Sequence, residues 1–240
     1  MKLIKTITLV LSAVLLTSCH FDINIGKVDG NGNVTTEERP VTESFHKVKG
    51  SAGLDVYLTE GSENKIVVEA DENLHEIIET EIHDGKLSIG TRESIGRSES
   101  KKVYVTYKSI DHVYASSGAD VIVNSILKSE YITLDVSSGS DLEVEVFARE
   151  VNAESSSGAD LKISGKATSL LASSSSGSEI DAEELIVLNC NADASSGGDI
   201  TVHVKEKLTT EATSGGSINY YGNPTAVSND ENRSGNVHKM

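Results

Sequence analysis

Residues 115–121 read Ala-Ser-Ser-Gly-Ala-Asp-Val, and the chain repeats this phrase five more times with small changes. The further copies occupy residues 136–142, 155–161, 174–180, 194–200 and 212–218. Their central glycines are Gly118, Gly139, Gly158, Gly177, Gly197 and Gly215. A near-constant period of about 20 residues indicates a repeat architecture, in which each unit buries its apolar face only against its neighbours.

Apolar and polar side chains alternate almost without interruption from residue 111 onward. Around the fifth copy, one parity is apolar or small: Leu188, Cys190, Ala192, Ala194, Ser196, Gly198, Ile200, Val202 and Val204. Because successive side chains of a strand point to opposite faces, we expect this set to line an interior. Such coils, stacked in register about 4.8 Å apart, form a parallel β-helix, whose crossovers are right-handed. The sequence therefore predicts an all-β, right-handed parallel β-helix.

The residues that flank each glycine are always small, which constrains the phrase itself. A serine precedes each glycine, as Ser138 precedes Gly139, and Ala, Ser or Gly follows it. If both neighbours point inward, the coil is pinched there, and each serine needs a partner in the next coil. Alternatively, each glycine takes a positive φ at a corner and the parity shifts. The sequence leaves both arrangements open.

Residues 41–110 are less regular and predict a β-rich N-terminal cap, so that one domain spans residues 41–240. Strand patterns occur at Phe45–Val48, Leu54–Leu58, Lys65–Ala70, Ile77–His83, Lys86–Ile89 and Val103–Tyr107. Asp84-Gly85 predicts a hairpin turn between two of these strands. Residues 90–102 are expected to form an exposed loop, and a degenerate phrase at residues 233–237 is expected to cap the other end.

Residues 1–18 carry the pattern of a signal peptide. Lys2 and Lys5 precede an apolar stretch, Ile7–Leu16, that is too short to span a bilayer. The Leu-Thr-Ser-Cys at residues 16–19 resembles the bacterial lipobox. That resemblance implies cleavage before Cys19, which becomes the lipidated first residue of the mature chain. An ordinary secretory signal with a chance cysteine is the alternative.

Residues 19–40 are rich in Gly, Asn, Thr and acidic residues, and we expect a flexible tether between the lipid and the domain. In Gram-negative lipoproteins, an Asp after the lipidated cysteine favours the inner membrane, whereas His20 occupies that position here. The resemblance therefore implies an outer-membrane lipoprotein of the cell envelope that contacts the membrane through its lipid. Whether the domain faces the periplasm or the cell surface stays open.

The composition excludes one class of partner. The formal net charge is −16, whereas a nucleic-acid-binding protein needs a basic face. Cations and basic proteins are compatible with this charge. Of the two cysteines, Cys190 alternates in phase with apolar residues, and we expect a small buried side chain without a catalytic role.

The phrase places an acidic residue two positions after five of its glycines, at Asp120, Asp141, Asp160, Glu179 and Asp199. In register, these residues form an outward column of carboxylates. A second acidic column lies four positions before the glycine, at Asp135, Glu154, Asp193 and Glu211. We expect either a solvated acidic face or a ladder for Ca²⁺, which prefers several oxygen ligands. The repeats lack the glycine-rich nonapeptide of calcium-binding β-rolls, and no residues are assigned to a metal.

A flat polar strip runs between the two acidic columns and could bind a glycan or an extended peptide. Its members are Ser116, Ser137, Ser156, Ser175, Ser195 and Thr213. Sugar sites usually add aromatic side chains, and the repeats offer only Tyr114 and Tyr220, near the two ends of the array. The strip is therefore a candidate surface without an identified ligand.

An enzyme is the main alternative class, because parallel β-helices include polysaccharide lyases and hydrolases. Each carboxylate of the columns sits in a near-identical repeat, so no pair is singled out as acid and base. No motif places a serine beside a base, and the histidines at positions 46, 75, 83, 112, 203 and 238 fit no metal spacing. We therefore expect no catalytic residues.

The run from about Val41 to Val237 resembles the head GIN domain of auto-transporter adhesins, which is common in lipoproteins of Bacteroidetes-type bacteria. The resemblance rests on residues 53–58, 70–74 and 84–87 and on the Ser-Ser-Gly-x-Asp phrases. It implies a lipid-anchored, non-catalytic protein with a binding or adhesin-like role. A passive structural or envelope-maintenance lipoprotein is the alternative, followed by a polysaccharide-acting β-helix enzyme.

Overall fold

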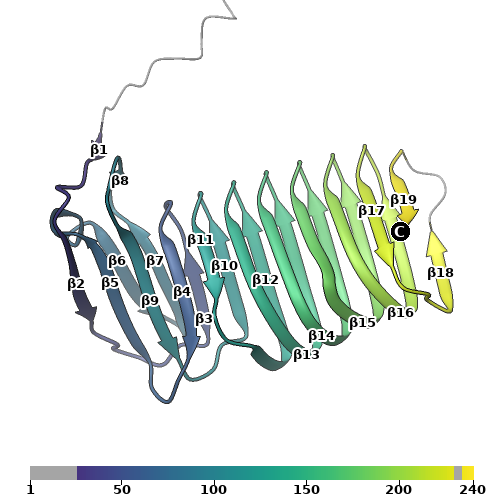
Figure 1. Ribbon diagram of the computed structural model, residues 1–240, viewed down its shortest axis with the longest axis horizontal. Helices are drawn as coiled ribbons and strands as arrows, with labels where there is room; N and C mark the ends of the chain where they lie inside the picture. Colours follow the sequence, from purple (N-terminus) through teal and green to yellow (C-terminus); the bar gives the residue numbers. More distant parts are fainter. Residues whose placement is uncertain (1–25, 230–233) are drawn as a thin grey trace, which may run out of the picture.

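The structure is a computed structural model that describes residues 26–229 and 234–240. These residues form a long β-solenoid whose coils lie side by side (Figure 1). The coils are built by β10 (His112–Ser116), β11 (Asp120–Val123), β12 (Leu127–Ser137), β13 (Asp141–Ser156), β14 (Asp160–Ser175), β15 (Glu179–Ser195), β16 (Asp199–Ala212) and β17 (Ser217–Tyr221). All pairings among these strands are parallel, so the predicted all-β parallel β-helix is confirmed.

Neighbouring coils pair with each phrase position opposite its own copy. Asp141 lies opposite Asp160, and Ser156 lies opposite Ser175. The turns between the coil faces form one edge of the solenoid, along the top of Figure 1. There the Gly118 N–H donates to the Ser138 carbonyl at 3.1 Å, and the Gly139 N–H donates to the Ser157 carbonyl at 3.1 Å. A backbone hydrogen-bond ladder therefore aligns the repeated glycines along this edge.

The turn geometry decides between the two arrangements of the phrase. Ser138 and Gly139 both have positive φ, at 60° and 66°, and the same holds for every copy. Both side-chain positions are exposed, whereas the next residue, Ser140, is fully buried. Positive φ at both central positions is the requirement of a type I′ turn, which lets the chain reverse in two residues. The serine before each glycine therefore faces water, and the expectation that Ser196 lines the interior is wrong.

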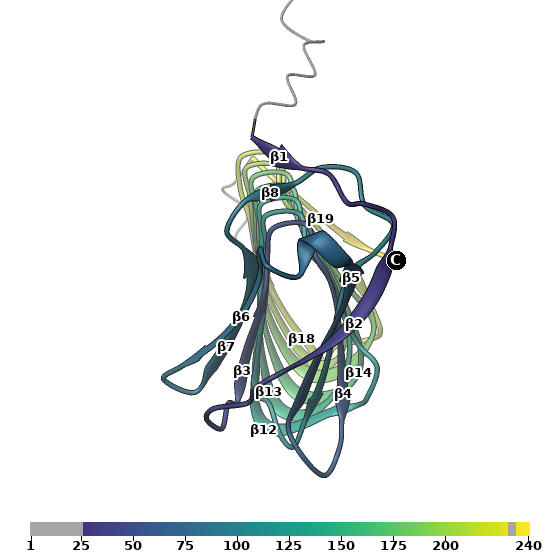
Figure 2. The same ribbon diagram turned by 90° about the vertical axis from the view of Figure 1, so that its left-hand side faces the viewer.

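In the six copies from residue 115 onward, the residue after the glycine is small where the two faces of the coil meet at this edge, as the end-on view of Figure 2 shows. A Cβ added to Gly198 would lie 2.5 Å from the Ser174 carbonyl oxygen. The buried serines bond carbonyls of their own turns. Ser140 Oγ donates to Ser137 O at 2.8 Å, and Ser155 Oγ donates to Ala159 O at 2.8 Å. Buried hydroxyls are thereby satisfied without a ladder between coils.

The interior is filled by Val, Ile, Leu and Ala from both coil faces. Cys190 is buried as predicted, and burial raises the pKa of its thiol to about 12. Leu188 was expected in the same interior set but is 37% exposed. Leu188 lies at a bend of β15, between the buried Val187 and Cys190, and the exposed Thr168 lies between the buried Ala167 and Leu170 at the paired bend of β14. The inward and outward positions therefore change order at this bend.

The N-terminal cap extends both coil faces beyond β10 and β11. Its strands are β1 (Lys27–Val28), β2 (Val34–Arg39), β3 (Lys47–Gly50), β4 (Asp55–Glu60), β5 (Lys65–Asp71), β6 (Ile78–His83), β7 (Lys86–Thr91), β8 (Ser94–Ile95) and β9 (Lys101–Tyr107). β3 and β4 pair in parallel with β10 and β11, and β6–β7 is the expected hairpin around Asp84-Gly85. The predicted β-rich cap is confirmed.

Two segments of the cap are more ordered than the sequence suggested. β2 pairs antiparallel with β5, so residues 34–39 belong to the sheet and not to a flexible tether. Residues 90–102 contain β8 and the buried Ser100, which an exposed loop would not. Asp71 joins the two segments: its carboxylate accepts bonds from the N–H groups of Gly32, Glu99 and Ser100 at 2.8–3.0 Å. The domain therefore begins before residue 41.

The C-terminal end continues the stack through β18 (Ala226–Asn229) and β19 (Asn236–Lys239). β18 pairs with β16, and β19 pairs with β17. The Gly215 N–H donates to the Ser234 carbonyl at 3.1 Å, as the earlier glycines do in their turns. The degenerate phrase thus adds a last coil; Arg233, its first residue, lies outside the described residues.

Candidate functional site

The carboxylates that follow the glycines form one continuous column on the outside of the solenoid. Asp120, Asp141, Asp160, Glu179 and Asp199 lie opposite one another in successive coils. Asp55 on β4 extends the column by one coil, because it pairs with Asp120. We call the set Asp55, Asp120, Asp141, Asp160, Glu179 and Asp199 the carboxylate column.

Asp55 was missed in the sequence, although the signal was present. Ala52 and Gly53 have positive φ, at 64° and 69°, and the Gly53 N–H donates to the Ser117 carbonyl at 3.0 Å. Residues 51–56, Ser-Ala-Gly-Leu-Asp-Val, are therefore a further copy of the phrase. The second Ser is replaced by Ala and the small residue after the glycine by Leu, which conceals the match. Lys102 pairs with Asp55 and places a cation at the end of the column.

Negative charges lie next to one another along the column, and the pKa values of several of its carboxyl groups are raised. Burial, followed by the charges of Asp120 and Asp160, raises the pKa of Asp141. Burial and the charges of Asp160, Asp181 and Asp199 raise the pKa of Glu179. Each resolved shift in the column is upward, so no acid–base pair with opposed pKa shifts arises there. The column therefore carries a negative electrostatic potential that attracts cationic groups.

A second outward row runs beside the column, two residues further along each strand. It contains Tyr104, Tyr57, Ile122, Glu143, Lys162 and Asp181 in register. The two tyrosine rings stack with centroids 5.3 Å apart and planes 19° from parallel. Lys162 Nζ lies 3.8 Å from Glu143 Oε1. The aromatic pair that the sequence did not reveal therefore adjoins the Asp55 end of the column.

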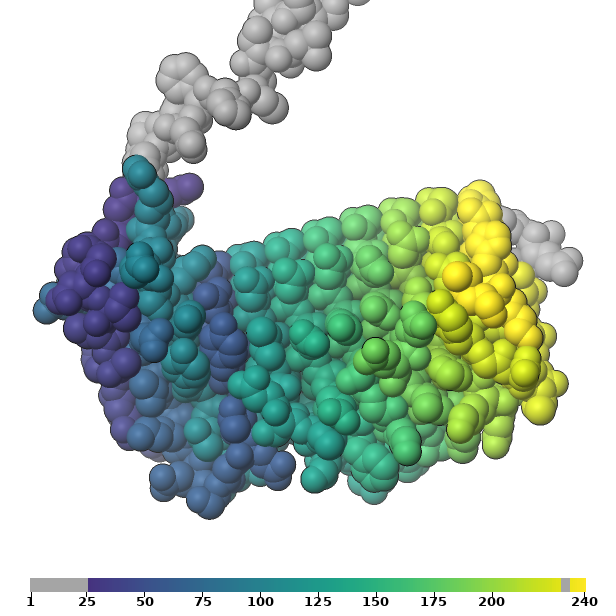
Figure 3. All heavy atoms as spheres, viewed as in Figure 1, coloured from purple at the N-terminus to yellow at the C-terminus, as the bar shows by residue number. Residues whose placement is uncertain are grey.

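The two rows enclose a shallow groove of about 450 Å³. It is lined by Asp120, Ile122, Asp141, Asp160, Lys162 and Asp181, among others. The lining comes from four successive coils, so the groove runs along the stack and not around one loop. On the face shown in Figure 3, the coils likewise form narrow parallel bands of surface. An elongated ligand fits this geometry better than a compact one.

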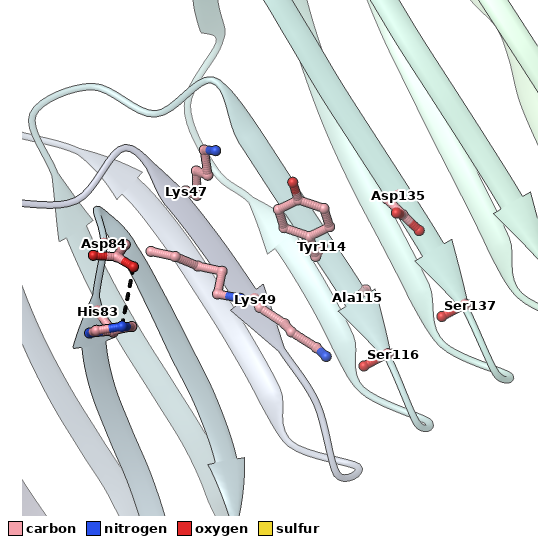
Figure 4. Close-up of a pocket in the computed structure, with 10 residues that line it drawn as sticks. Lys47, Lys49, His83, Asp84, Tyr114, Ala115, Ser116, Asp135 and Ser137 are labelled. Carbon is pink, nitrogen blue, oxygen red and sulfur yellow. Dashed lines mark ion pairs between the residues drawn. The ribbon is translucent and has the colours of Figure 1, made fainter.

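The opposite coil face carries the second acidic column, with a basic end. Asp135 pairs with Glu154, and Asp193 pairs with Glu211. Tyr114 precedes Asp135 in the row and pairs with Lys49. Lys47, Lys49 and Lys86 line a groove of about 520 Å³ together with Tyr114 and Asp135 (Figure 4). This face mixes charges, whereas the carboxylate column keeps one sign over six coils.

The sequence suggested that the histidines are scattered, but the structure brings two of them together. His46 and His112 flank Asp111 at the start of β3 and β10, and both Nδ1 atoms lie within hydrogen-bond distance of Asp111 Oδ1. The phrase offset explains this contact: Gly53 and Gly118 are 65 positions apart, and so are His46 and Asp111. Among the described residues, this is the one group of three side chains with the separations of metal ligands.

Cys19, the predicted lipidation site, lies outside the described residues. Over the parts of the chain that the structure covers, helices of the length and hydropathy needed to cross a membrane are absent.

Comparison with known proteins supports the resemblance. A family model described as "Putative auto-transporter adhesin, head GIN domain" matches residues 44–224. A putative adhesin from Bacteroides fragilis has the same fold, with a TM-score of 0.81 and 18% identity over 89% of this chain and 100% of that chain. A putative adhesin from Parabacteroides merdae has a TM-score of 0.67 and 23% identity over 90% of this chain and 99% of that chain. A putative lipid binding protein from Parabacteroides distasonis has a TM-score of 0.66 and 17% identity over 88% of this chain and 99% of that chain. No curated protein matches significantly.

Proposed function

Because the chain belongs to the head GIN domain family of auto-transporter adhesins, we propose that it is a non-catalytic adhesin that binds a basic partner along the carboxylate column. The observation that carries this proposal is the register of six carboxylates in adjacent coils, beside a groove of about 450 Å³. Neighbouring charges about 4.8 Å apart repel by about 0.9 kcal/mol at the dielectric constant of water. A ligand with several cationic groups adds attractive interactions that offset this repulsion.

The mechanism is multivalent. Each coil offers one carboxylate, and single exposed ion pairs contribute only about 0–1 kcal/mol. A partner that contacts several coils gains from each without a new loss of translational freedom. The stacked Tyr57–Tyr104 pair adds an apolar contact at one end of the groove, where Lys102 terminates the negative potential. A protein surface that presents spaced Lys and Arg side chains meets these requirements.

Membrane attachment through Cys19 completes the proposal. Lipidation at Cys19 and export to the outer membrane would place the solenoid at the envelope, with residues 20–25 as the link to the first described strand. Growth with a clickable palmitate analogue should label the chain. Cys19→Ser should abolish that label and release the chain from the membrane fraction, whereas Cys190→Ser should retain both. Labelling of Cys19→Ser would exclude this attachment.

The column is tested by binding with matched variants. Purified chain is applied to an array of glycans and matrix proteins, and retained ligands are measured by biolayer interferometry at low and physiological salt. Asp120→Asn, Asp141→Asn and Asp160→Asn are combined in one variant, and Asp135→Asn, Glu154→Gln and Asp193→Asn on the opposite face form the control. The column variant should bind at least tenfold more weakly, and salt should weaken the wild type most.

Two outcomes would contradict the proposal. If no array member is retained, the chain is a passive structural lipoprotein of the envelope. If a glycan is retained and both triple variants bind it equally, the ligand contacts a surface other than the carboxylate column.

A further inference from the structure

We propose that His46, Asp111 and His112 form a binding site for a divalent transition-metal ion such as Zn²⁺. His46 Nδ1 lies 3.0 Å from Asp111 Oδ1, and His112 Nδ1 lies 2.6 Å from the same oxygen. One potential ligand atom from each residue lies within 4.8 Å of the other two. Ligands of a tetrahedral Zn²⁺ ion are separated by about 3.4 Å, given bond lengths of about 2.0–2.2 Å. The separations in the structure, from 2.6 Å up to the 4.8 Å limit, bracket that spacing.

The backbone that carries the three residues is fixed by the coil stack. The Asp111 N–H donates to the His46 carbonyl at 3.0 Å, and the Thr133 N–H donates to the Asp111 carbonyl at 2.9 Å. The His46 N–H donates in turn to the Gly85 carbonyl at 2.9 Å. Four neighbouring chain segments therefore hold the site in one hydrogen-bonded row. Prior organisation of this kind lowers the cost of bringing ligands together.

The two imidazole rings are also positioned by their neighbours. The His112 ring stacks on Tyr114, with centroids 6.1 Å apart and planes 25° from parallel. A Cβ on Gly85 would lie 3.0 Å from His46 Cδ2, so the glycine leaves space for that ring. Gly85 also has a φ of 71°, which favours glycine at this turn. The site thus has orienting contacts beyond its ligands, as metal sites usually do.

The ligand chemistry selects the class of ion. Two imidazole nitrogens and one carboxylate suit Zn²⁺, Cu²⁺ or Ni²⁺, whereas Ca²⁺ and Mg²⁺ require mostly oxygen ligands. The side chains of His46 and Asp111 are 50% and 37% exposed, so an ion can enter from solvent. Three protein ligands leave at least one coordination position for water or for a group on a binding partner. The site lies where the cap meets the first coil, at the starts of β3 and β10, apart from the carboxylate column, and its metal binding does not depend on the proposed adhesin function.

Isothermal titration of the purified, metal-free chain with ZnCl₂ tests this site. The wild type should bind one equivalent with saturable heat, and CaCl₂ should give none. His46→Gln, His112→Gln and Asp111→Asn should each weaken Zn²⁺ binding at least tenfold. His203→Gln, which removes an outward histidine far along the stack, should bind as the wild type does. Circular dichroism of each variant confirms that the fold is retained.

Absorption of the Co²⁺-loaded chain gives a second readout, because visible bands report tetrahedral nitrogen and oxygen ligands and should disappear in His112→Gln. Failure of the wild type to bind Zn²⁺ would overturn the proposal. So would retention of wild-type affinity in the His46 and His112 variants, or an equal loss in His203→Gln.

Discussion

Asp120 and Asp141 lie opposite each other in adjacent coils, and the negative charge of Asp120 helps to raise the pKa of Asp141. The parallel register imposes this contact between like charges, because every coil repeats the same phrase at the same height. A cation or a basic partner would offset this repulsion. The carboxylate column therefore links the fold to the proposed binding function.

Neutralising one carboxylate inside the column should stabilise the fold. Asp141→Asn removes repulsion from both Asp120 and Asp160 and should raise the free energy of unfolding by about 1 kcal/mol at low salt. Salt screens exposed charges, so the gain should shrink at high ionic strength. Urea denaturation at two salt concentrations measures the effect. A loss of stability in Asp141→Asn would show that the carboxylate makes net favourable contacts in the free chain.

The pH dependence of the column has a definite sign. The pKa values of Asp55, Asp141 and Glu179 are raised on folding, so the folded state holds protons that the unfolded state releases. The slope of unfolding free energy with pH is then negative for these groups. Their contribution is fully present below the ordinary carboxyl pKa and is lost as pH rises through the raised values.

Other carboxyl groups oppose this trend, so the pH test compares variants. Wild type and the triple variant Asp120→Asn, Asp141→Asn, Asp160→Asn are melted between pH 4 and pH 7. The stability advantage of the triple variant should be largest at pH 7 and should narrow towards pH 4. An advantage that does not change with pH would contradict the assigned shifts.

The pH dependence that Asp71 gives to stability should have the opposite sign to that of the carboxylate column. Burial raises its pKa, but bonds from the N–H groups of Ser100, Gly32 and Glu99 outweigh that effect and lower it. Asp71→Asn replaces one accepting oxygen by a donor, and should destabilise the cap by about 1–3 kcal/mol. The contribution of Asp71 is present above the ordinary carboxyl pKa and is lost as pH falls through its lowered value. Hydrogen exchange should increase first in residues 30–39; unchanged exchange there would show that Asp71 does not hold this segment.

The repeat turns allow two glycines to be compared directly. Gly158 has a φ of 69° and open space around an added Cβ, so Gly158→Ala should cost only the left-handed backbone strain of about 1–2 kcal/mol. In Gly198→Ala, the new Cβ would meet the Ser174 carbonyl oxygen at 2.5 Å, and overpacking should cost more, about 3 kcal/mol. Thermal denaturation ranks the two. A larger loss for Gly158→Ala would contradict the turn geometry.

Much of this fold follows from the spacing of the glycines, because a fixed period and strict alternation admit few architectures. The interior positions of β12–β16 were predictable wherever the alternation is unbroken. Leu188 was not, because it lies at a bend where the buried Val187 and Cys190 are separated by two positions and the strict alternation is interrupted. The same limit applies to β2: its pairing with β5 and the bond from Gly32 to Asp71 join residues far apart in the sequence, which a local pattern does not contain.

The candidate site was predictable where it repeats and hidden where it does not. The five acidic residues of the phrase were found from position alone, whereas Asp55 lies in a copy with two substituted positions. His46 and Asp111 meet only because that degenerate copy stacks on the copy at Gly118. The order of coils within the cap, where antiparallel strands separate the copies, decides which side chains become neighbours.

Accessibility of the solenoid on intact cells tests the adhesin role most directly. The chain, tagged at its C-terminus, is expressed in an envelope-competent bacterial host, and whole cells are treated with proteinase K. We expect loss of the tagged chain from intact cells while a periplasmic marker survives. Protection of the chain until the outer membrane is permeabilised would place the carboxylate column in the periplasm and would contradict a role in adhesion.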